Sequence, residues 1–295
     1  IENAIITGEI DLSQIELEIR EINGKKMRVV ESAIRITNSI IQEEANFSTY
    51  FPEIQRVSPV LLTEEVSFRN TRFNGKADFA GVLFDEEADF SRVQFRKGVD
   101  FWRIQFKKRA NFDRAQFNEE AILVEAQFAG EAYFGGAQFN TETYFAAAQF
   151  AGEAVFWGTE FNKGIYFMQT QFDKEALFVG AQFNDEANFE GAQFNDEISF
   201  LGTSFKTIFI EWKQIKGKFE YDGLFYIRLI KNFKGIEQFK DADDAYYSYR
   251  VNKRKIREKW HDYPTSLLEF IFLDLSCGYG VKPERAILYG LVLIF

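Results

Sequence analysis

Residues 186–194 read EANFEGAQF, and the pattern in this stretch decides the fold. Its two phenylalanines, Phe189 and Phe194, each follow a small side chain by two residues, Ala187 and Ala192. In an extended strand, residues two apart point to the same side, and the residue between them points to the other side. The pattern therefore predicts short strands with alanine and phenylalanine facing inward and a polar residue facing outward.

The pattern repeats along the chain from Phe68 to Phe205. Phenylalanine returns at alternating spacings of five and six residues, so the repeat is eleven residues long, and Leu123 is the only substitute. A fixed short period is typical of solenoid proteins, whose repeats stack on one another. We expect the phenylalanines to form the structural core, represented by Phe79, Phe90, Phe112, Phe134, Phe156, Phe178, Phe189 and Phe200.

An eleven-residue period also suits a right-handed coiled coil, but the spacing argues against helices here. Steps of five and six residues place successive phenylalanines on opposite sides of a helix, so no single apolar stripe forms. Glycine also recurs between the phenylalanines, as at Gly130 and Gly152, beside Asn and Asp. These residues disfavour a helix and favour turns. Short strands joined by turns fit better.

With these residues in view, the chain resembles the pentapeptide-repeat family, in its phenylalanine-centred variant with an eleven-residue double repeat. The resemblance implies a right-handed quadrilateral β-helix, in which the central residue and the residue two before it stack inward. In the usual family pattern every face takes five residues, whereas alternate faces take six here. We therefore expect a mainly β fold with coils of about 22 residues, stacked about 4.8 Å apart.

Composition argues against an enzyme. The chain has one cysteine, Cys277, and one histidine, His261, which excludes a disulfide framework and disfavours a Cys/His metal site. Phosphate-binding loops and nucleophile motifs are also lacking in the sequence. Acidic pairs such as Asp185 with Glu186 recur at turns, where they keep a stack of strands soluble. The alternative is that acidic side chains stacked along one corner of the solenoid bind cations. We expect no cofactor, no metal site and no catalytic residue.

Charge is distributed unevenly along the chain, whose net charge is −10. Residues 1–65 carry 6 basic and 12 acidic side chains, and residues 66–109 carry 10 and 6. Residues 110–205 carry 3 and 15, and residues 206–295 carry 16 and 12. Nucleic-acid binding needs clustered Lys and Arg, so the acidic later repeats make nucleic acid an unsuitable partner.

Four segments follow from these patterns. We expect irregular β coils and a cap over residues 1–65, the phenylalanine-centred β-helix over 66–205, a helical linker over 206–285, and the beginning of a transmembrane helix over 286–295. Within the linker, helices are predicted over residues 224–233, 236–259 and 267–275, the first ending at Gly235 and the third at Gly278.

The last ten residues read AILYGLVLIF and carry no charge. A membrane-spanning helix needs about 20 apolar residues, so this run is half a span. We expect it to begin a transmembrane helix that continues beyond residue 295; the alternative is a C-terminal core helix. Basic residues precede the run, so the positive-inside rule places the solenoid in the cytoplasm.

A set of basic residues lies close to this expected membrane entry. We expect them to contact anionic lipid, because each Lys or Arg near a membrane surface adds about 1 kcal/mol of attraction. The alternative is an ordinary solvated helix end. The set comprises Lys253, Arg254, Lys255, Arg257, Lys259, Lys282 and Arg285.

Two C-terminal stretches carry a further resemblance. Residues 241–250 read DADDAYYSYR, and residues 275–283 read LSCGYGVKP. They resemble the linker that joins pentapeptide repeats to a two-helix, potassium-channel-like pore in a group of prokaryotic membrane proteins. The resemblance implies a cytoplasmic solenoid attached to a pore in a tetramer. The GYG at 278–280 precedes the apolar run, so it is interpreted as a glycine-rich turn and not as a selectivity filter.

The sequence thus supports two hypotheses. In the first, the β-helix is the cytoplasmic domain of a membrane-anchored, channel-like protein, where it acts as a scaffold, an oligomerisation module or a gating module and binds a protein partner. In the alternative, the protein is a soluble pentapeptide-repeat interaction protein that mimics DNA or binds gyrase.

Overall fold

The computed structural model describes residues 1–22, 24–51, 56–258 and 263–294. The chain divides into two compact units, Ile1–Ile210 and Glu211–Phe295. The first unit is mainly β, and the second is helical. The division lies five residues after Phe205, the last phenylalanine of the repeat.

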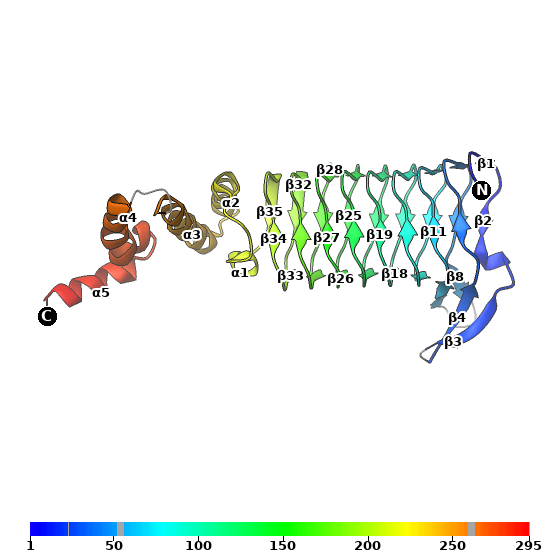
Figure 1. Cartoon of the computed structure of the whole chain (residues 1–295), viewed down its shortest axis with the longest axis horizontal. Helices are drawn as coiled ribbons and strands as arrows, with labels where there is room; N and C mark the ends of the chain where they lie inside the picture. Colours follow the sequence, from blue (N-terminus) through cyan, green and yellow to red (C-terminus); the bar gives the residue numbers. More distant parts are fainter. Residues whose placement is uncertain (23, 52–55, 259–262, 295) are drawn as a thin grey trace. The chain divides into compact units, whose positions relative to one another are not determined.

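The first unit is a β-solenoid whose coils stack one on the next (Figure 1). From Arg72 onward, each coil contributes one short strand to each of four parallel columns. Paired residues in adjacent coils are 22 positions apart, as Phe73 with Phe95 and Phe84 with Phe106. The prediction of a β-solenoid with a coil of about 22 residues is confirmed.

The strands of the four columns are as follows. The first column contains β1 (Ile5–Ile6), β6 (Ile40–Ile41), β12 (Arg72–Phe73), β16 (Gln94–Phe95), β20 (Gln116–Phe117), β24 (Gln138–Phe139), β28 (Glu160–Phe161), β32 (Gln182–Asn188) and β35 (Ser204–Phe209). The second contains β2 (Ile10–Asp11), β7 (Ala45–Asn46), β13 (Ala77–Asp78), β17 (Val99–Asp100), β21 (Ala121–Ile122), β25 (Thr143–Tyr144) and β29 (Ile165–Tyr166), and β32 joins it to the first.

The third column contains β3 (Glu18–Ile22), β4 (Lys25–Val30), β10 (Val60–Leu62), β14 (Leu83–Phe84), β18 (Gln105–Phe106), β22 (Gln127–Phe128), β26 (Gln149–Phe150), β30 (Gln171–Phe172) and β33 (Gln193–Phe194). The fourth contains β5 (Ile34–Arg35), β11 (Val66–Ser67), β15 (Ala88–Asp89), β19 (Ala110–Asn111), β23 (Ala132–Tyr133), β27 (Ala154–Val155), β31 (Ala176–Leu177) and β34 (Ile198–Ser199).

The core of the solenoid is built from stacked aromatic rings. Most inward phenylalanines stack on a counterpart 22 residues away; Phe112 and Phe134, for example, have ring centroids 5.0 Å apart and an interplanar angle of 3°. Rings of neighbouring columns meet edge to face, as Phe134 and Phe145 do at 5.5 Å. Both geometries are favourable for aromatic pairs, and each buried ring contributes on the order of 1.5–3 kcal/mol.

The two kinds of corner have different backbone geometry. At each five-residue step the phenylalanine carbonyl accepts a hydrogen bond from the amide three residues on, as Phe112 does from Ala115 at 3.0 Å. The residue two after the phenylalanine has positive φ, which a type II turn requires at its third residue. At the six-residue steps, asparagine side chains bond from coil to coil: Asn140 donates to Asn118 at 2.9 Å, and Asn162 to Asn140 at 2.8 Å.

The N-terminal residues form less regular coils of the same solenoid. Strands β5, β6 and β7 pair in parallel with β11, β12 and β13. Two antiparallel hairpins interrupt the pattern: β3 pairs with β4, and β8 (Thr49–Phe51) pairs with β9 (Arg56–Ser58). A 3₁₀-helix, η1 (Leu12–Gln14), precedes the first hairpin.

The second unit consists of helices, of which α3 is the longest at 20 residues. They are α1 (Trp212–Ile215), α2 (Gly223–Gly235), α3 (Phe239–Glu258), α4 (Tyr263–Glu269), the π-helix η2 (Phe270–Leu275), the 3₁₀-helix η3 (Gly278–Gly280) and α5 (Pro283–Ile294). Asp222 caps α2 by accepting from the amides of Leu224 and Phe225. Helix α2 packs along α3, and α3 packs against α4. The prediction of a helical segment after the solenoid is confirmed.

Helix α5 covers most of the apolar C-terminal run and has 12 residues. Within the described ranges of the chain, no helix combines the length and apolar character that crossing a bilayer requires. The transmembrane helix expected to begin at residue 286 stays a prediction.

Candidate functional site

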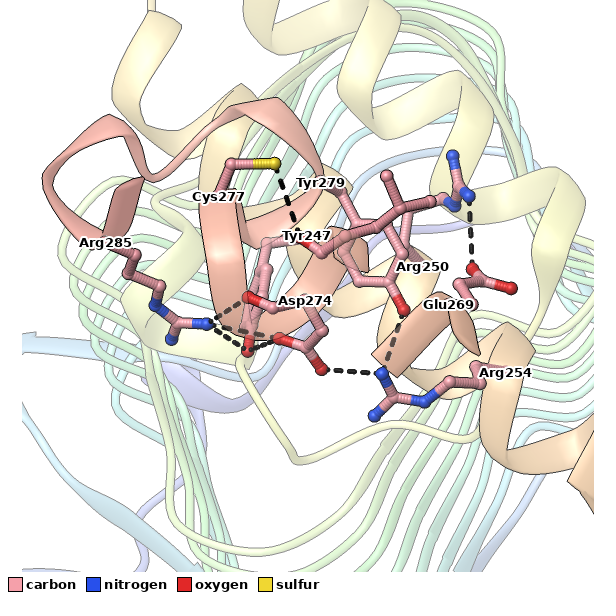
Figure 2. Close-up of polar contacts among 9 residues, drawn as sticks. Tyr247, Arg250, Arg254, Glu269, Asp274, Cys277, Tyr279 and Arg285 are labelled. Carbon is pink, nitrogen blue, oxygen red and sulfur yellow. Dashed lines mark hydrogen bonds and ion pairs between the residues drawn. The ribbon is translucent and has the colours of Figure 1, made fainter. Parts of the chain in front are cut away.

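Two of the basic residues singled out in the sequence, Arg254 and Arg285, meet in the helical unit at the carboxylate of Asp274 (Figure 2). Asp274 lies in η2, within the otherwise apolar run FIFLDL, and it is 5% exposed. A buried carboxylate is costly unless it is paired and hydrogen-bonded. The surroundings of Asp274 supply both kinds of partner.

Three side chains from two other helices donate to Asp274. Arg254 of α3 donates through Nη1 to Oδ2 at 2.7 Å. The hydroxyl of Tyr247, also on α3, donates to Oδ1 at 2.8 Å. Arg285 of α5 donates through Nη1 to Oδ1 at 3.1 Å and to the Asp274 carbonyl at 3.0 Å. The carboxylate therefore joins α3, η2 and α5 (Figure 2).

The CGYG stretch completes this cluster from η3. The hydroxyl of Tyr279 accepts from Arg254 Nη1 at 3.1 Å, and burial raises the pKa of this phenol. Tyr279 has φ of +57°, between two glycines that also have positive φ, so the chain turns tightly and directs the ring inward. The interpretation of this stretch as a glycine-rich turn is confirmed.

Two further ion pairs flank the cluster. Arg250 Nη2 donates to Glu269 Oε1 at 3.1 Å, and its guanidinium lies 4.7 Å from the centre of the Tyr279 ring. Lys282, just before α5, pairs with Asp244 of α3. Charged groups of α3 therefore hold the start of α5 at two points, Asp244 and the Asp274 cluster.

The arrangement suits a mechanical role better than a chemical one. Both carboxylate oxygens of Asp274 already accept hydrogen bonds, so neither is free to act as a base. In the described part of the chain, no three His, Cys, Asp or Glu side chains are grouped so as to hold a metal ion. We call Tyr247, Arg254, Asp274, Tyr279 and Arg285 the Asp274 latch, because together they connect α3 to α5.

The predicted core and the predicted basic set have different placements. The eight core phenylalanines are all buried. Of the basic set, Lys253 and Lys255 are exposed, and Lys282 and Arg285 are half-buried in the pairs described above. Arg254 is 7% exposed and points to Asp274, so it does not belong to an exposed stripe. Arg257 lies in α3, and Lys259 lies outside the described residues, as does His261.

Exposed apolar side chains are concentrated beside the latch. Phe272 of η2 is 66% exposed, and Ile287 near the start of α5 is 69% exposed. Most apolar residues of the preceding segment are also exposed, and we call them the α4–η2 apolar surface: Leu267, Leu268, Phe270, Phe272, Leu273 and Leu275. Grouped exposed apolar side chains are a candidate surface for contact with another molecule or a membrane.

Sequence reasoning did not single out Asp274, Tyr247 or Tyr279 as parts of a site. One signal was available, because Asp274 is the only charged residue between Phe270 and Cys277. A single charge in an apolar run indicates a buried, paired group. Its partners Arg254 and Arg285 are 20 and 11 positions away, so the pairing itself required the structure.

The geometry defines the chain as a β-solenoid repeat protein followed by a helical unit. Two stretches of the solenoid, residues 61–105 and 123–168, match the family model described as pentapeptide repeats (9 copies). These stretches include Phe79, Phe90, Phe134 and Phe156 of the predicted core. A comparison with curated proteins gave no significant match.

Proposed function

We propose that the protein is a non-enzymatic scaffold whose solenoid binds a protein partner and whose helical unit attaches to a membrane. The observation that carries the membrane part is the α4–η2 apolar surface, where Leu268 and Phe272 are exposed. In water, such a surface is unfavourable by about 25 cal/mol for each Å² of apolar area that a bilayer would cover.

Exposed charges elsewhere in the helical unit support the same partner. Lys253 and Lys255 are exposed on α3, where they can reach anionic headgroups. The Asp274 latch fixes the first turn of α5 to α3, so the uncharged residues from Ala286 onward begin at a defined point. A partner bound to the solenoid would then be tethered to the membrane through the chain.

The proposal has three finer parts: the attachment to a potassium-channel-like pore, the assembly into a tetramer and the cytoplasmic location of the solenoid. These three parts rest on the resemblance of residues 241–250 and 275–283 to channel linkers. The alternative, a DNA mimic that binds gyrase, fits less well, because Arg103, Lys107 and Arg109 project from the earlier coils.

Flotation with vesicles containing phosphatidylserine tests the membrane part. We expect the full chain to float and the double variant Leu268→Glu, Phe272→Glu to stay at the bottom of the gradient, because two charges oppose insertion of this surface. The matched control changes two exposed apolar residues of the solenoid, Trp157→Glu and Leu201→Glu, and should float like the wild type. Equal flotation of all three proteins would contradict the proposal.

A further inference from the structure

One outer surface of the solenoid changes from polar to apolar along its length. In the fourth column, the outward residues of β15 and β19 are Asp89 and Asn111. The next three strands present apolar or aromatic side chains instead: Tyr133 pairs with Val155, and Val155 pairs with Leu177. This surface therefore differs from the earlier coils of the same column.

The turn that follows these strands widens the apolar area. Trp157 and Leu201 lie two residues after Val155 and Ser199, and they are 54% and 51% exposed. Val155 is only 3% exposed, so its neighbours cover it and the surface is closely packed. An exposed tryptophan beside packed aliphatic side chains is typical of the centre of a binding surface.

A ladder of four glutamates borders this apolar area. Glu131, Glu153, Glu175 and Glu197 each immediately precede a strand of the column, two residues before its outward side chain. The amides of Ala132 and Ala154 donate to the carbonyls of Glu153 and Glu175 at 2.9 Å, so the glutamates lie in successive coils. At an interstrand spacing of about 4.8 Å, the four span about 14 Å.

The ladder is not neutralised in the way that several acidic residues of the earlier coils are. Elsewhere, basic and acidic residues one coil apart form ion pairs, as Arg109 with Glu87 at 2.6 Å and Arg103 with Glu125 at 2.7 Å. Among the described residues, the four ladder glutamates have no ion-pair partner. Burial, together with Glu175 and Glu131, raises the pKa of Glu153, which indicates that the ladder repels itself.

We propose that this surface, formed by Tyr133, Trp157, Leu177, Leu201 and the glutamate ladder, binds a basic amphipathic helix of a protein partner. The inference deepens the proposed scaffold function and rests on it. Lys or Arg side chains at positions i, i+4 and i+7 of a helix recur about every 5.4 Å, close to the ladder spacing. Apolar side chains on the adjacent stripe of that helix would cover Trp157 and Leu177.

Charge complementarity favours a basic amphipathic helix over other kinds of partner. The ladder favours a cationic partner, which excludes nucleic acid and disfavours an acidic protein. The apolar column beside the ladder favours a helix with a defined apolar stripe over a disordered polybasic segment. Binding would remove the repulsion among the glutamates and cover the exposed tryptophan at the same time.

The test uses the full chain and a labelled 18-residue Lys/Leu amphipathic peptide as the probe, with a scrambled peptide of the same composition. We expect saturable binding of the amphipathic peptide by fluorescence anisotropy and at least tenfold weaker binding of the scrambled one. The double variant Glu153→Gln, Glu175→Gln and the single variant Trp157→Ala should each weaken binding of the amphipathic peptide about tenfold.

A matched control removes two exposed glutamates that lie beside a polar strand of the second column, Glu43→Gln with Glu44→Gln, which precede β7 and its outward residue Asn46. It should change the affinity less than twofold. Absent binding to the wild type, or an equal loss in the control, would overturn the inference. The ladder variants should still float with vesicles, so a failure here is distinguishable from a failure of the membrane proposal.

Discussion

At the scale of the residue, the helical unit contains a carboxylate placed between two guanidinium groups. One carboxylate oxygen of Asp274 accepts a hydrogen bond from Arg254, and the other accepts hydrogen bonds from Arg285 and Tyr247. Buried charges are tolerated when every partner is present, and they become costly when one is removed. The latch is therefore a place where a small change in charge should loosen several helices together.

Replacing Asp274 by asparagine tests this dependence. We expect Asp274→Asn to destabilise the helical unit by about 3 kcal/mol, because two arginines lose their shared countercharge. Hydrogen exchange of the full chain should rise in α3, η2 and the first turn of α5, and stay unchanged in the solenoid. Asp243→Asn, an exposed position on α3, is the control. Similar exchange in both variants would contradict the role of the latch.

The glutamate ladder gives a prediction that depends on pH. The pKa of Glu153 is raised in the folded protein, so folding disfavours the charged form. This cost is absent below the unfolded-state pKa of about 4.3 and is fully present above the folded pKa. Glu153→Gln should therefore be more stable than the wild type at pH 7 in urea unfolding, and the difference should close as the pH falls toward 4. A difference that persists at pH 4 would contradict the account.

At the scale of the element, each aromatic column is a stack whose members meet their counterparts one coil away. Leu123 interrupts the second column between Phe101 and Phe145, and it is fully buried. Ala121 and Ala126 flank it, as small residues flank the phenylalanines of other coils. The position thus has the surroundings of a phenylalanine site without the ring.

We expect Leu123→Phe to stabilise the solenoid by about 1 kcal/mol, because it restores two ring contacts without enlarging the coil. Thermal unfolding followed by circular dichroism measures the change. Leu123→Ala is the companion variant and should lower stability by about 2–5 kcal/mol through the cavity that it leaves. A loss of stability in Leu123→Phe would contradict this expectation, because it would show that the coil has no room for a phenylalanine ring at this position.

Periodicity predicted most of the solenoid and little of the helical unit. The alternation of five and six residues was sufficient for the coil length, because every coil obeys the same local rule. The turn residues were less predictable: Arg92, Arg103 and Ala147 have positive φ at positions where glycine is expected. The hairpin of β3 and β4 was also not predicted, because it lies outside the repeat.

The basic set shows why the site was harder to predict. Arg254 lies between two exposed lysines, so its sequence surroundings are those of a solvated helix end. Its burial depends on the later residues Asp274 of η2 and Tyr279 of η3, which both contact Arg254 of α3. Pairings of this kind come from tertiary contacts and leave no local pattern.

At the scale of the whole molecule, the chain combines two units with different surfaces. The solenoid is closed inside and offers a glutamate ladder beside an apolar strip. The helical unit has both exposed apolar residues and exposed lysines. Two surfaces of different chemistry suit a scaffold with two kinds of partner, a protein for the solenoid and a membrane for the helices.

Hydrogen exchange of the full chain, with and without phosphatidylserine vesicles, tests this division most directly. We expect vesicles to slow exchange in α4, η2 and the start of α5, because lipid covers the α4–η2 apolar surface, and to leave exchange in the solenoid columns unchanged. Unchanged exchange throughout α4 and η2, or protection confined to the solenoid, would contradict it.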